Sequence, residues 1–414
     1  MKALLRAALV AAIALGGARS ARPQGLPSEP ISVAGGRVTF GADVSATVAP
    51  EDTGFFNYTD YDHSALRTLR VDFSTAATLN PHFAVLAELR DELALLGQVA
   101  DESVNTLRAY ALYVRIRPWT DRAIDIQAGR VPPTFGAFAR RVYPADNPLI
   151  GYPLAYQYLT SLRPDALPWS ADELLQMRGR GWLSNFSIGD QSKQNGVPLI
   201  SAFRWDTGVQ LHAASSVLDG TVSVTTGTLS NPRVTDDNSA PQVAARVSAH
   251  PIPGLIVGVS AARGPFVSST AARGAVGDGN DQSFTQTAWG ADVEYSRGYY
   301  LVRAETIWSQ WKLPALGAPV IDVPLTALST YIEGRYKLRP GLYIAGRFDH
   351  LGFSDVVGSA GPQTWEAPVS RVEAGVGYSL QRNVLLKVSC QYNTRDGGRV
   401  THATLPAVQI VYWF

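Results

Sequence analysis

Residues 371–395 read RVEAGVGYSLQRNVLLKVSCQYNTR. Along this stretch, apolar residues alternate with polar ones, as Val372, Ala374, Val376 and Tyr378 do with Arg371 and Glu373, and as Leu386, Val388, Cys390 and Tyr392 do with Lys387, Ser389 and Gln391. Successive side chains of a strand point to opposite faces, so this period of two predicts two strands with one apolar and one polar face each. Residues 381–383 form a short turn between them. The stretch therefore predicts an antiparallel hairpin.

The same alternation continues from residue 37 to the C-terminus. It predicts about sixteen strands, each near the roughly 9 to 11 residues that a tilted strand needs to cross a membrane. Short connections, such as 80–81, 251–254, 296–298 and 339–341, take turns with long ones at 51–65, 91–106, 231–240, 267–283, 315–325, 355–369 and 393–402. The fold class is therefore all-β: a transmembrane antiparallel β-barrel with short periplasmic turns and long extracellular loops.

The composition agrees with a barrel whose wall is apolar on one face and polar on the other. The 414 residues carry 36 Lys and Arg against 35 Asp and Glu, and only 17% of residues are charged. The balance argues against nucleic-acid binding, which needs a basic excess. The chain after residue 20 lacks an apolar run of about 18 residues, so it has no transmembrane helix and would have to cross a membrane as a closed barrel. A single cysteine, Cys390, excludes an intrachain disulfide.

The N-terminus reads as an export signal. Lys2 and Arg6 precede an apolar run at 7–15 and then small residues, which is the pattern of a cleaved signal peptide. We therefore expect a signal peptide at 1–20, a short periplasmic segment at 21–36 and a barrel at 37–414. The segment before the first strand is too short for a folded plug domain.

The third long connection, at about 132–203, is the longest. It opens with Pro132 and Pro133, which cannot continue a strand ladder. Ser170 and Glu173 form a capping-box pattern, and Gly179 follows as a stop signal. The connection therefore predicts a helix of about two turns within a long loop.

The C-terminal residues are the most specific motif. Val408, Ile410, Tyr412 and Phe414 alternate along the last strand, and the chain ends on an aromatic residue. This barrel-closing segment resembles the C-terminal signature of bacterial outer-membrane proteins. The resemblance implies an outer-membrane location in a Gram-negative-type bacterium, contact with outer-membrane lipid and recognition by the barrel assembly machinery.

Within that superfamily, the hairpin layout is similar to that of general and phosphate-selective porins. The resemblance implies that the long third loop folds into the barrel and narrows it, and that the protein is a homotrimer. The residues expected to carry the constriction are Arg163, Asp172, Glu173, Arg178 and Arg180.

Charged residues occupy the face opposite the apolar one. A dry core would not tolerate so many ions, whereas the wall of a wetted pore does. The expected pore-lining residues are Arg70, Asp72, Glu88, Arg90, Arg115, Arg117, Asp125, Arg246, Asp292, Glu294, Arg303, Glu305, Glu333, Arg335, Lys337, Arg347, Asp349, Arg371, Glu373 and Lys387. Their nearly balanced signs predict passive, weakly selective diffusion of small hydrophilic solutes or ions.

Other readings remain open. An adhesin or structural barrel would share the strand pattern but have a closed lumen. A barrel-embedded hydrolase is less favoured, because the six histidines lie in no nucleophile motif and no Gly-x-Ser-x-Gly occurs. We expect no enzyme activity, no cofactor and no metal site. Aromatic residues are expected in the interface girdles, namely Tyr300, Trp308, Trp311, Tyr336, Tyr378, Tyr392 and Tyr412.

Overall fold

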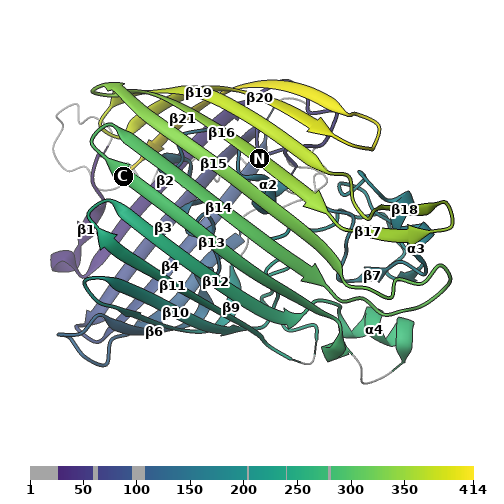
Figure 1. Cartoon of the computed structure of the whole chain (residues 1–414). Coiled ribbons are helices and arrows are strands. Elements are labelled where there is room, and N and C mark those ends of the chain that lie inside the picture. The colour runs from purple at the N-terminus through teal and green to yellow at the C-terminus, as the bar shows by residue number, and fades with distance from the viewer. Residues whose placement is uncertain (1–26, 59–63, 96–107, 203–204, 239, 278–280) are drawn as a thin grey trace, which may run out of the picture.

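The computed structural model describes residues 27–58, 64–95, 108–202, 205–238, 240–277 and 281–414. Within them, sixteen antiparallel strands form one closed barrel (Figure 1). These strands are β2 (Val38–Val48), β3 (Thr68–Asn80), β4 (Phe83–Ala94), β5 (Arg108–Ile116), β6 (Ile124–Val131), β9 (Asp206–Ala214), β10 (Leu218–Thr225), β11 (Gln242–Ile252), β12 (Leu255–Pro265), β13 (Thr285–Arg297), β14 (Tyr300–Trp311), β15 (Leu325–Arg339), β16 (Leu342–Phe353), β19 (Val369–Gln381), β20 (Val384–Arg395) and β21 (His402–Trp413). The predicted signal peptide lies outside the described residues.

The first and last barrel strands close the ring. β2 pairs with β3 on one side and with β21 on the other, where Ala46 faces Ile410 and Val48 faces Val408. A short strand, β1 (Ile31–Val33), adds to β2 beside this junction. The segment 371–395 forms the hairpin β19–β20, in which Glu373 faces Gln391. The predicted barrel class and the predicted closure by the C-terminal strand are confirmed.

The connections differ at the two ends of the barrel. Short turns gather at one end of the strands, and long connections gather at the other, which we call the short-turn end and the long-loop end (Figure 1). The smaller elements are η1 (Ala34–Gly36), η2 (Ala139–Arg141), η3 (Pro144–Asp146), α2 (Leu154–Gln157), β7 (Ala166–Leu167), α3 (Ala171–Gln176), β8 (Ile188–Gly189), α4 (Ser269–Val276), η4 (Asp281–Ser283), β17 (Asp355–Gly358) and β18 (Gly361–Thr364). None of the helices in the described ranges is long and apolar enough to span a bilayer.

The wall has two chemically different faces. The outward side chains Val372, Val388 and Ile410 are 50%, 49% and 45% exposed, whereas their inward neighbours Arg371 and Glu373 are fully buried. Cys390 is also exposed, on the outward face. This alternation is what a strand needs when hydrocarbon covers one face and polar groups cover the other.

One aromatic residue lies on the face opposite to the one predicted. Trp311 was expected in an outward girdle, but it is fully buried inside the barrel, with ring centroids 5.8 Å from Trp365 and 6.4 Å from Phe266. Trp308 is three positions away, so the period of two places the two tryptophans on opposite faces. Trp308 instead faces Trp289 across the strand pair.

The predicted helix in the long connection is confirmed as α3. The Ser170 hydroxyl caps it by accepting a hydrogen bond from the Glu173 N–H at 3.4 Å. Glu173 does not complete the reciprocal bond of a capping box, because its carboxylate accepts from the Trp169 N–H instead. Gly179, with φ of +71°, follows the helix in a conformation that favours glycine.

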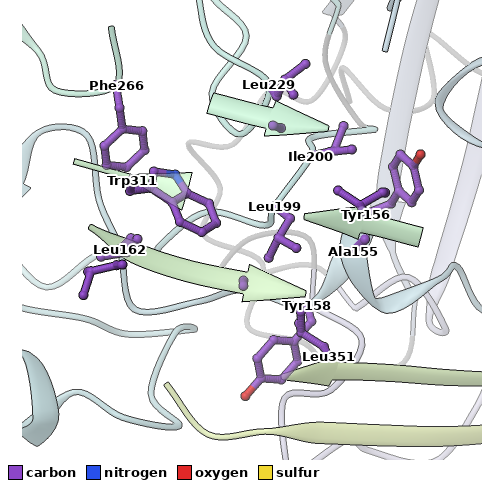
Figure 2. Packing of buried hydrophobic residues seen from close by; sticks show 14 of the residues in the cluster. Ala155, Tyr156, Tyr158, Leu162, Leu199, Ile200, Leu229, Phe266, Trp311 and Leu351 are labelled. Atoms are coloured by element: carbon purple, nitrogen blue, oxygen red, sulfur yellow. The ribbon is translucent and has the colours of Figure 1, made fainter. Parts of the chain in front are cut away.

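The hydrophobic core lies inside the barrel. Figure 2 shows Tyr156, Leu162, Leu199 and Ile200 of the long connection packed with wall residues Trp311 and Leu351 and with Leu229 and Phe266. We call residues 132–203 the lumen loop, because its side chains supply much of this cluster. The barrel therefore encloses a packed apolar core toward its long-loop end.

Candidate functional site

The candidate site is the inner wall of the barrel together with the lumen loop. Most of the wall residues predicted from the charge pattern are less than a tenth exposed, namely Arg70, Asp72, Glu88, Arg90, Asp125, Arg246, Asp292, Glu305, Glu333, Arg347, Asp349, Arg371, Glu373 and Lys387. The others are more accessible and lie near or just beyond the short-turn end of a strand, namely Arg115, Arg117, Glu294, Arg303, Arg335 and Lys337. The interior therefore becomes drier toward the long loops.

Charged wall residues on β3 and β4 form one network. Arg70 Nε lies 2.6 Å from Asp72 Oδ2, and Arg90 pairs with both Asp72 and Glu88. Tyr143 of the lumen loop donates a hydrogen bond of 2.6 Å to Glu88. Buried charges of opposite sign are thus brought together, which offsets part of the cost of removing them from water.

A second network joins β15, β16 and β19. The guanidinium of Arg347 lies 2.9 Å from Asp349, 3.3 Å from Glu333 and 2.8 Å from Glu373. One arginine thereby holds carboxylates from three adjacent strands. This cluster cross-links the wall on its inner side.

The wall charges also hold the main chain of the lumen loop. Glu373 Oε1 accepts hydrogen bonds from the N–H groups of Ile150 at 3.2 Å and Gly151 at 3.0 Å. Arg371 donates to the Tyr152 carbonyl at 3.1 Å, and Lys387 Nζ donates to the Pro144 carbonyl at 2.5 Å. Buried backbone groups need such partners, because a loop has no ladder of its own.

A different part of the wall holds the beginning of the loop. Glu305 on β14 accepts from the Ala137 N–H at 2.7 Å and from the Tyr156 hydroxyl at 2.8 Å. Gly136, with φ of +77°, donates its N–H to the Ser260 hydroxyl at 3.1 Å. A Cβ on Gly136 would lie 2.4 Å from the Tyr156 hydroxyl oxygen, so this close approach requires glycine.

These contacts come from strands far apart around the ring. Residues 134–158 bond to β9, β12 and β14 and also to β3, β4, β16, β19 and β20. Each of the sixteen barrel strands carries at least one inward side chain that is less than a tenth exposed. The lumen loop therefore crosses the barrel and packs against its wall at mid-height.

The residues predicted for the constriction lie farther along the loop. Arg163 is buried and bonds to Asp165 and to the Ser192 carbonyl. Asp172 accepts from the N–H and hydroxyl of Ser359, and Glu173 accepts from those of Ser187. Arg178 donates to Thr364, and Arg180 is exposed. Asp172 and Arg178 join the lumen loop to other long connections, whereas Arg163 and Glu173 bond within the loop itself. The role of all five residues in a constriction stays a prediction.

One further carboxylate joins the loops at the long-loop end. Glu366 is fully buried and accepts hydrogen bonds from the N–H groups of Ser161 at 2.7 Å and Gly179 at 2.5 Å. Burial raises the pKa of the Glu366 carboxyl above its ordinary value. The lumen loop is thus fixed to the segment between β18 and β19.

Some interior residues were not singled out from the sequence. Phe56, in the first long connection, is fully buried in the core, and its carbonyl accepts from Arg371 at 2.8 Å. The guanidinium of Arg395 lies 4.8 Å from the centre of its ring. Two adjacent aromatic residues, Phe55 and Phe56, in a connection otherwise rich in polar residues were the available signal.

The described residues offer no metal-binding group of three or more His, Cys, Asp or Glu side chains. The nearest arrangement is His212, whose ring nitrogens lie 2.7 Å from Asp219 and 3.4 Å from Asp125. These residues lie on adjacent strands of the inner wall, where they form a local ion-pair cluster if the imidazole is protonated.

Comparison with known proteins shows the fold. No family model and no curated protein sequence matches the chain. Among solved structures, the chain is similar to OmpF of Salmonella typhi in complex with daunomycin, with TM-score 0.54 and 11% identity over 91% of this chain and 97% of that one. An anion-selective porin from Comamonas acidovorans gives TM-score 0.53 at 10% identity over 91% of this chain and 99% of that one. The outer-membrane channel DcaP of Acinetobacter baumannii gives 0.52 at 11% over 93% and 99%.

Proposed function

We propose that this chain, whose fold is that of outer-membrane porins, is a channel for passive diffusion of small hydrophilic solutes or ions across the outer membrane of a Gram-negative-type bacterium. The observation that carries the proposal is the polarity of the inner wall. Ionisable side chains such as Arg70, Glu333 and Arg347 point inward from the same strands that present valine, leucine and isoleucine outward. A lumen with such a wall suits water and polar solutes. The short-turn end then faces the periplasm.

Weak selectivity follows from how the inner charges are arranged. Arg246 pairs with Asp292 and Arg303 with Glu294, as Arg70 does with Asp72. A solute that passes such pairs meets local dipoles and no extended field of one sign. We therefore expect the channel to conduct cations and anions at similar rates, without enzymatic turnover or a cofactor.

Assembly completes the proposal. The C-terminal strand β21, together with the Phe414 that follows it, would be recognised by the barrel assembly machinery, and outer-membrane lipid would cover the apolar outer face. By analogy with the general porin layout, we propose a homotrimer. Cross-linking of the protein in native membranes tests the subunit number.

A second candidate function is favoured by the hydrogen bonds that hold the lumen loop against the wall. Residues 134–158 bond to the inner face of strands on different sides of the barrel. The barrel could therefore serve as an adhesin or structural barrel with a closed lumen. The two candidates differ in one property, which is ion conductance.

The experiment is single-channel recording of the mature protein in planar bilayers, in symmetric potassium chloride and then in a salt gradient. We compare it with the Glu305→Ala/Glu373→Ala variant, which removes the acceptors of the Ala137, Ile150 and Gly151 N–H groups. Heat-dependent migration in electrophoresis shows that each barrel is closed and folded.

A porin gives discrete currents with a reversal potential near zero, and larger currents when the lumen loop is released. Currents in the variant alone would favour the closed structural barrel. Folded barrels that are silent in both forms would refute the proposed function.

A further inference from the structure

A group of cations lies on the inner wall between the lumen loop and the short-turn end. Arg303 on β14 and Arg335 and Lys337 on β15 point into the lumen there, and Arg141 of the lumen loop lies beside them. We call these four residues the basic cluster. The three arginines are half-buried and Lys337 is exposed, so the cluster is open to solutes that enter from the short-turn end.

Two of these cations share one carboxylate. Glu294 on β13 lies 3.0 Å from Arg303 Nε, and the same carboxylate oxygen pairs with Arg141. Asp146 of the lumen loop is also exposed, and it interacts electrostatically with Arg141 and Arg303 but not with Arg335. The four cations of the basic cluster therefore face two accessible carboxylates.

The carboxylates deeper in the wall are matched by cations of their own. Three buried residues of each sign lie together on β15, β16, β19 and β20, namely Glu333, Asp349 and Glu373 with Arg347, Arg371 and Lys387. The positive excess of the basic cluster is thus not cancelled from behind.

Arg335 is the cluster residue that is fixed in place without a partner of opposite charge. Within the described residues, no carboxylate lies at ion-pair distance from Arg335, and its Nε is buried without a hydrogen bond. Its guanidinium carbon lies 5.7 Å from the centre of the Tyr343 ring. That ring is itself fixed, because its hydroxyl donates to the Pro148 carbonyl at 3.0 Å and its face lies over Gly377, where a Cβ would collide with it. An aromatic ring attracts a guanidinium but does not neutralise it.

The exposed edge of this guanidinium suits an oxyanion. The two Nη atoms of Arg335 also lack a protein partner but, in contrast to its Nε, are not buried, so they face the lumen. A guanidinium presents its N–H groups in a planar fork that matches two oxygens of a carboxylate or a phosphate group. Lys337 lies two residues farther along the same face of β15, about 7 Å away, and adds a second positive charge.

We propose that the basic cluster is a binding site for small solutes that carry a carboxylate or a phosphate group, and that Arg335 holds the oxyanion. The inference rests on the proposed function for the arrival of solutes at the short-turn end, and it names one class of solute that the lumen retains. The cluster lies on the short-turn side of the lumen loop, so binding requires no passage past the loop. The paired arginines Arg70 and Arg246 do not offer such a site, because Asp72 and Asp292 already occupy their guanidinium groups.

The test measures equilibrium binding to the folded protein in detergent micelles by saturation-transfer NMR. The probes are benzoate and phenyl phosphate, and benzamide is the neutral match of benzoate. Arg335→Gln removes the charge, whereas Arg335→Lys keeps the charge but not the fork. Because Arg335 makes no hydrogen bond, neither change leaves a protein group unpaired. Heat-dependent migration in electrophoresis checks that each variant is folded.

The matched control is Arg115→Gln. Arg115 is likewise a half-buried inward arginine near the short-turn end, and it makes no ion pair with any described residue, but it lies on β5. Its replacement removes the same charge from the same end of the lumen and leaves the basic cluster intact.

We expect benzoate and phenyl phosphate to bind the wild type, and benzamide not to bind. Arg335→Gln should weaken oxyanion binding at least about fivefold, because charge-assisted hydrogen bonds are lost. Arg335→Lys should fall between Arg335→Gln and the wild type, and Arg115→Gln should bind like the wild type. Binding of only one of the two oxyanions would still support the site and would identify its class.

Equal losses in Arg335→Gln and Arg115→Gln would point to a general positive field and overturn the inference. Equal binding of benzamide and benzoate would overturn it too, because it would indicate apolar adsorption. Single-channel recording of the same preparation separates the two proposals. A conducting protein that binds neither oxyanion keeps the proposed function and loses the site, whereas a folded, silent protein that binds them loses the proposed function and keeps the site in a barrel open at one end.

Discussion

The Tyr156 hydroxyl donates a hydrogen bond of 2.8 Å to the carboxylate of Glu305, although the two residues lie 149 positions apart in the chain. Tyr156 belongs to α2 in the lumen loop, and Glu305 lies on the inner face of β14. The same carboxylate accepts from the Ala137 N–H. One wall residue therefore fixes two separate parts of the loop.

Removing the Tyr156 hydroxyl should weaken this attachment. Tyr156→Phe leaves a fully buried carboxylate with one hydrogen bond fewer, which should lower the free energy of unfolding by about 1 to 3 kcal/mol. Urea unfolding in lipid vesicles, followed by tryptophan fluorescence, measures it. Tyr300→Phe is the control, because Tyr300 is 59% exposed. Equal effects of both changes would mean that the Glu305 contact does not hold the loop.

The stability of the long-loop end should depend on pH through Glu366. Burial raises the pKa of the Glu366 carboxyl in the folded chain above its ordinary value of 4.5. The Glu366 carboxyl therefore binds a proton more readily in the folded chain than in the unfolded chain. The stability that protonated Glu366 contributes is fully present below the ordinary pKa and is lost as the pH rises through the folded pKa. Glu366→Gln should match the wild type in acid and become relatively more stable toward neutral pH.

Urea midpoints of both proteins across an acid-to-neutral series measure this difference. Glu51→Gln, at an exposed glutamate in another long connection, is the matched control and should show a constant difference. A constant difference for Glu366→Gln as well would contradict the assignment.

The two faces of the barrel should respond differently to loss of a tryptophan. Trp311→Ala opens a void in the interior core and should cost about 3 to 5 kcal/mol of stability. Trp289→Ala, at a residue that is 58% exposed on the outer face, should cost less, because lipid fills the space left behind. Chemical unfolding of both variants in the same vesicles compares them. A larger loss at Trp289 would show that Trp311 is not a core residue in the membrane.

Neutralising Arg178 and Arg180 should alter the single-channel current. Arg180 is exposed at the long-loop end, and Arg178 holds Thr364 through its guanidinium at 2.9 Å, so their loss changes both the local charge and the loop packing. Recording of Arg178→Gln/Arg180→Gln beside the wild type measures the change. Unchanged current would remove this part of the lumen loop from the conducting path.

The strands of the wall could be predicted from the sequence because each strand has different surroundings on its two faces. Hydrocarbon selects Val388 outward and the interior selects Lys387 and Ser389, so the pattern is local and repeats with period two. The helix α3 could also be predicted, because its capping signal is local: Ser170 and Glu173 are only three residues apart. The prediction for Trp311 was wrong because it followed the general preference of aromatic residues for the interface girdles. The position of Trp311 in the period of two places its side chain on the inner face.

The seating of the lumen loop could not be predicted from local pattern. Glu373 accepts from the Ile150 N–H, 223 positions away, and every residue except proline has such an N–H to donate. The amino-acid sequence therefore does not reveal main-chain contacts of this kind. That the loop folds into the barrel was expected only from the resemblance of the hairpin layout to that of general porins.

The pairing of β2 with β21 brings together residues from opposite ends of the chain, such as Val48 and Val408. The ring can thus be completed only after β21 has been synthesised, and the lumen loop, which precedes β21 in the chain, is available to pack against the wall before the ring closes. A protein truncated before His402 would expose two unpaired edges and invite aggregation, however well its earlier hairpins had formed. Formation of the closed barrel therefore depends on the twelve-residue strand β21.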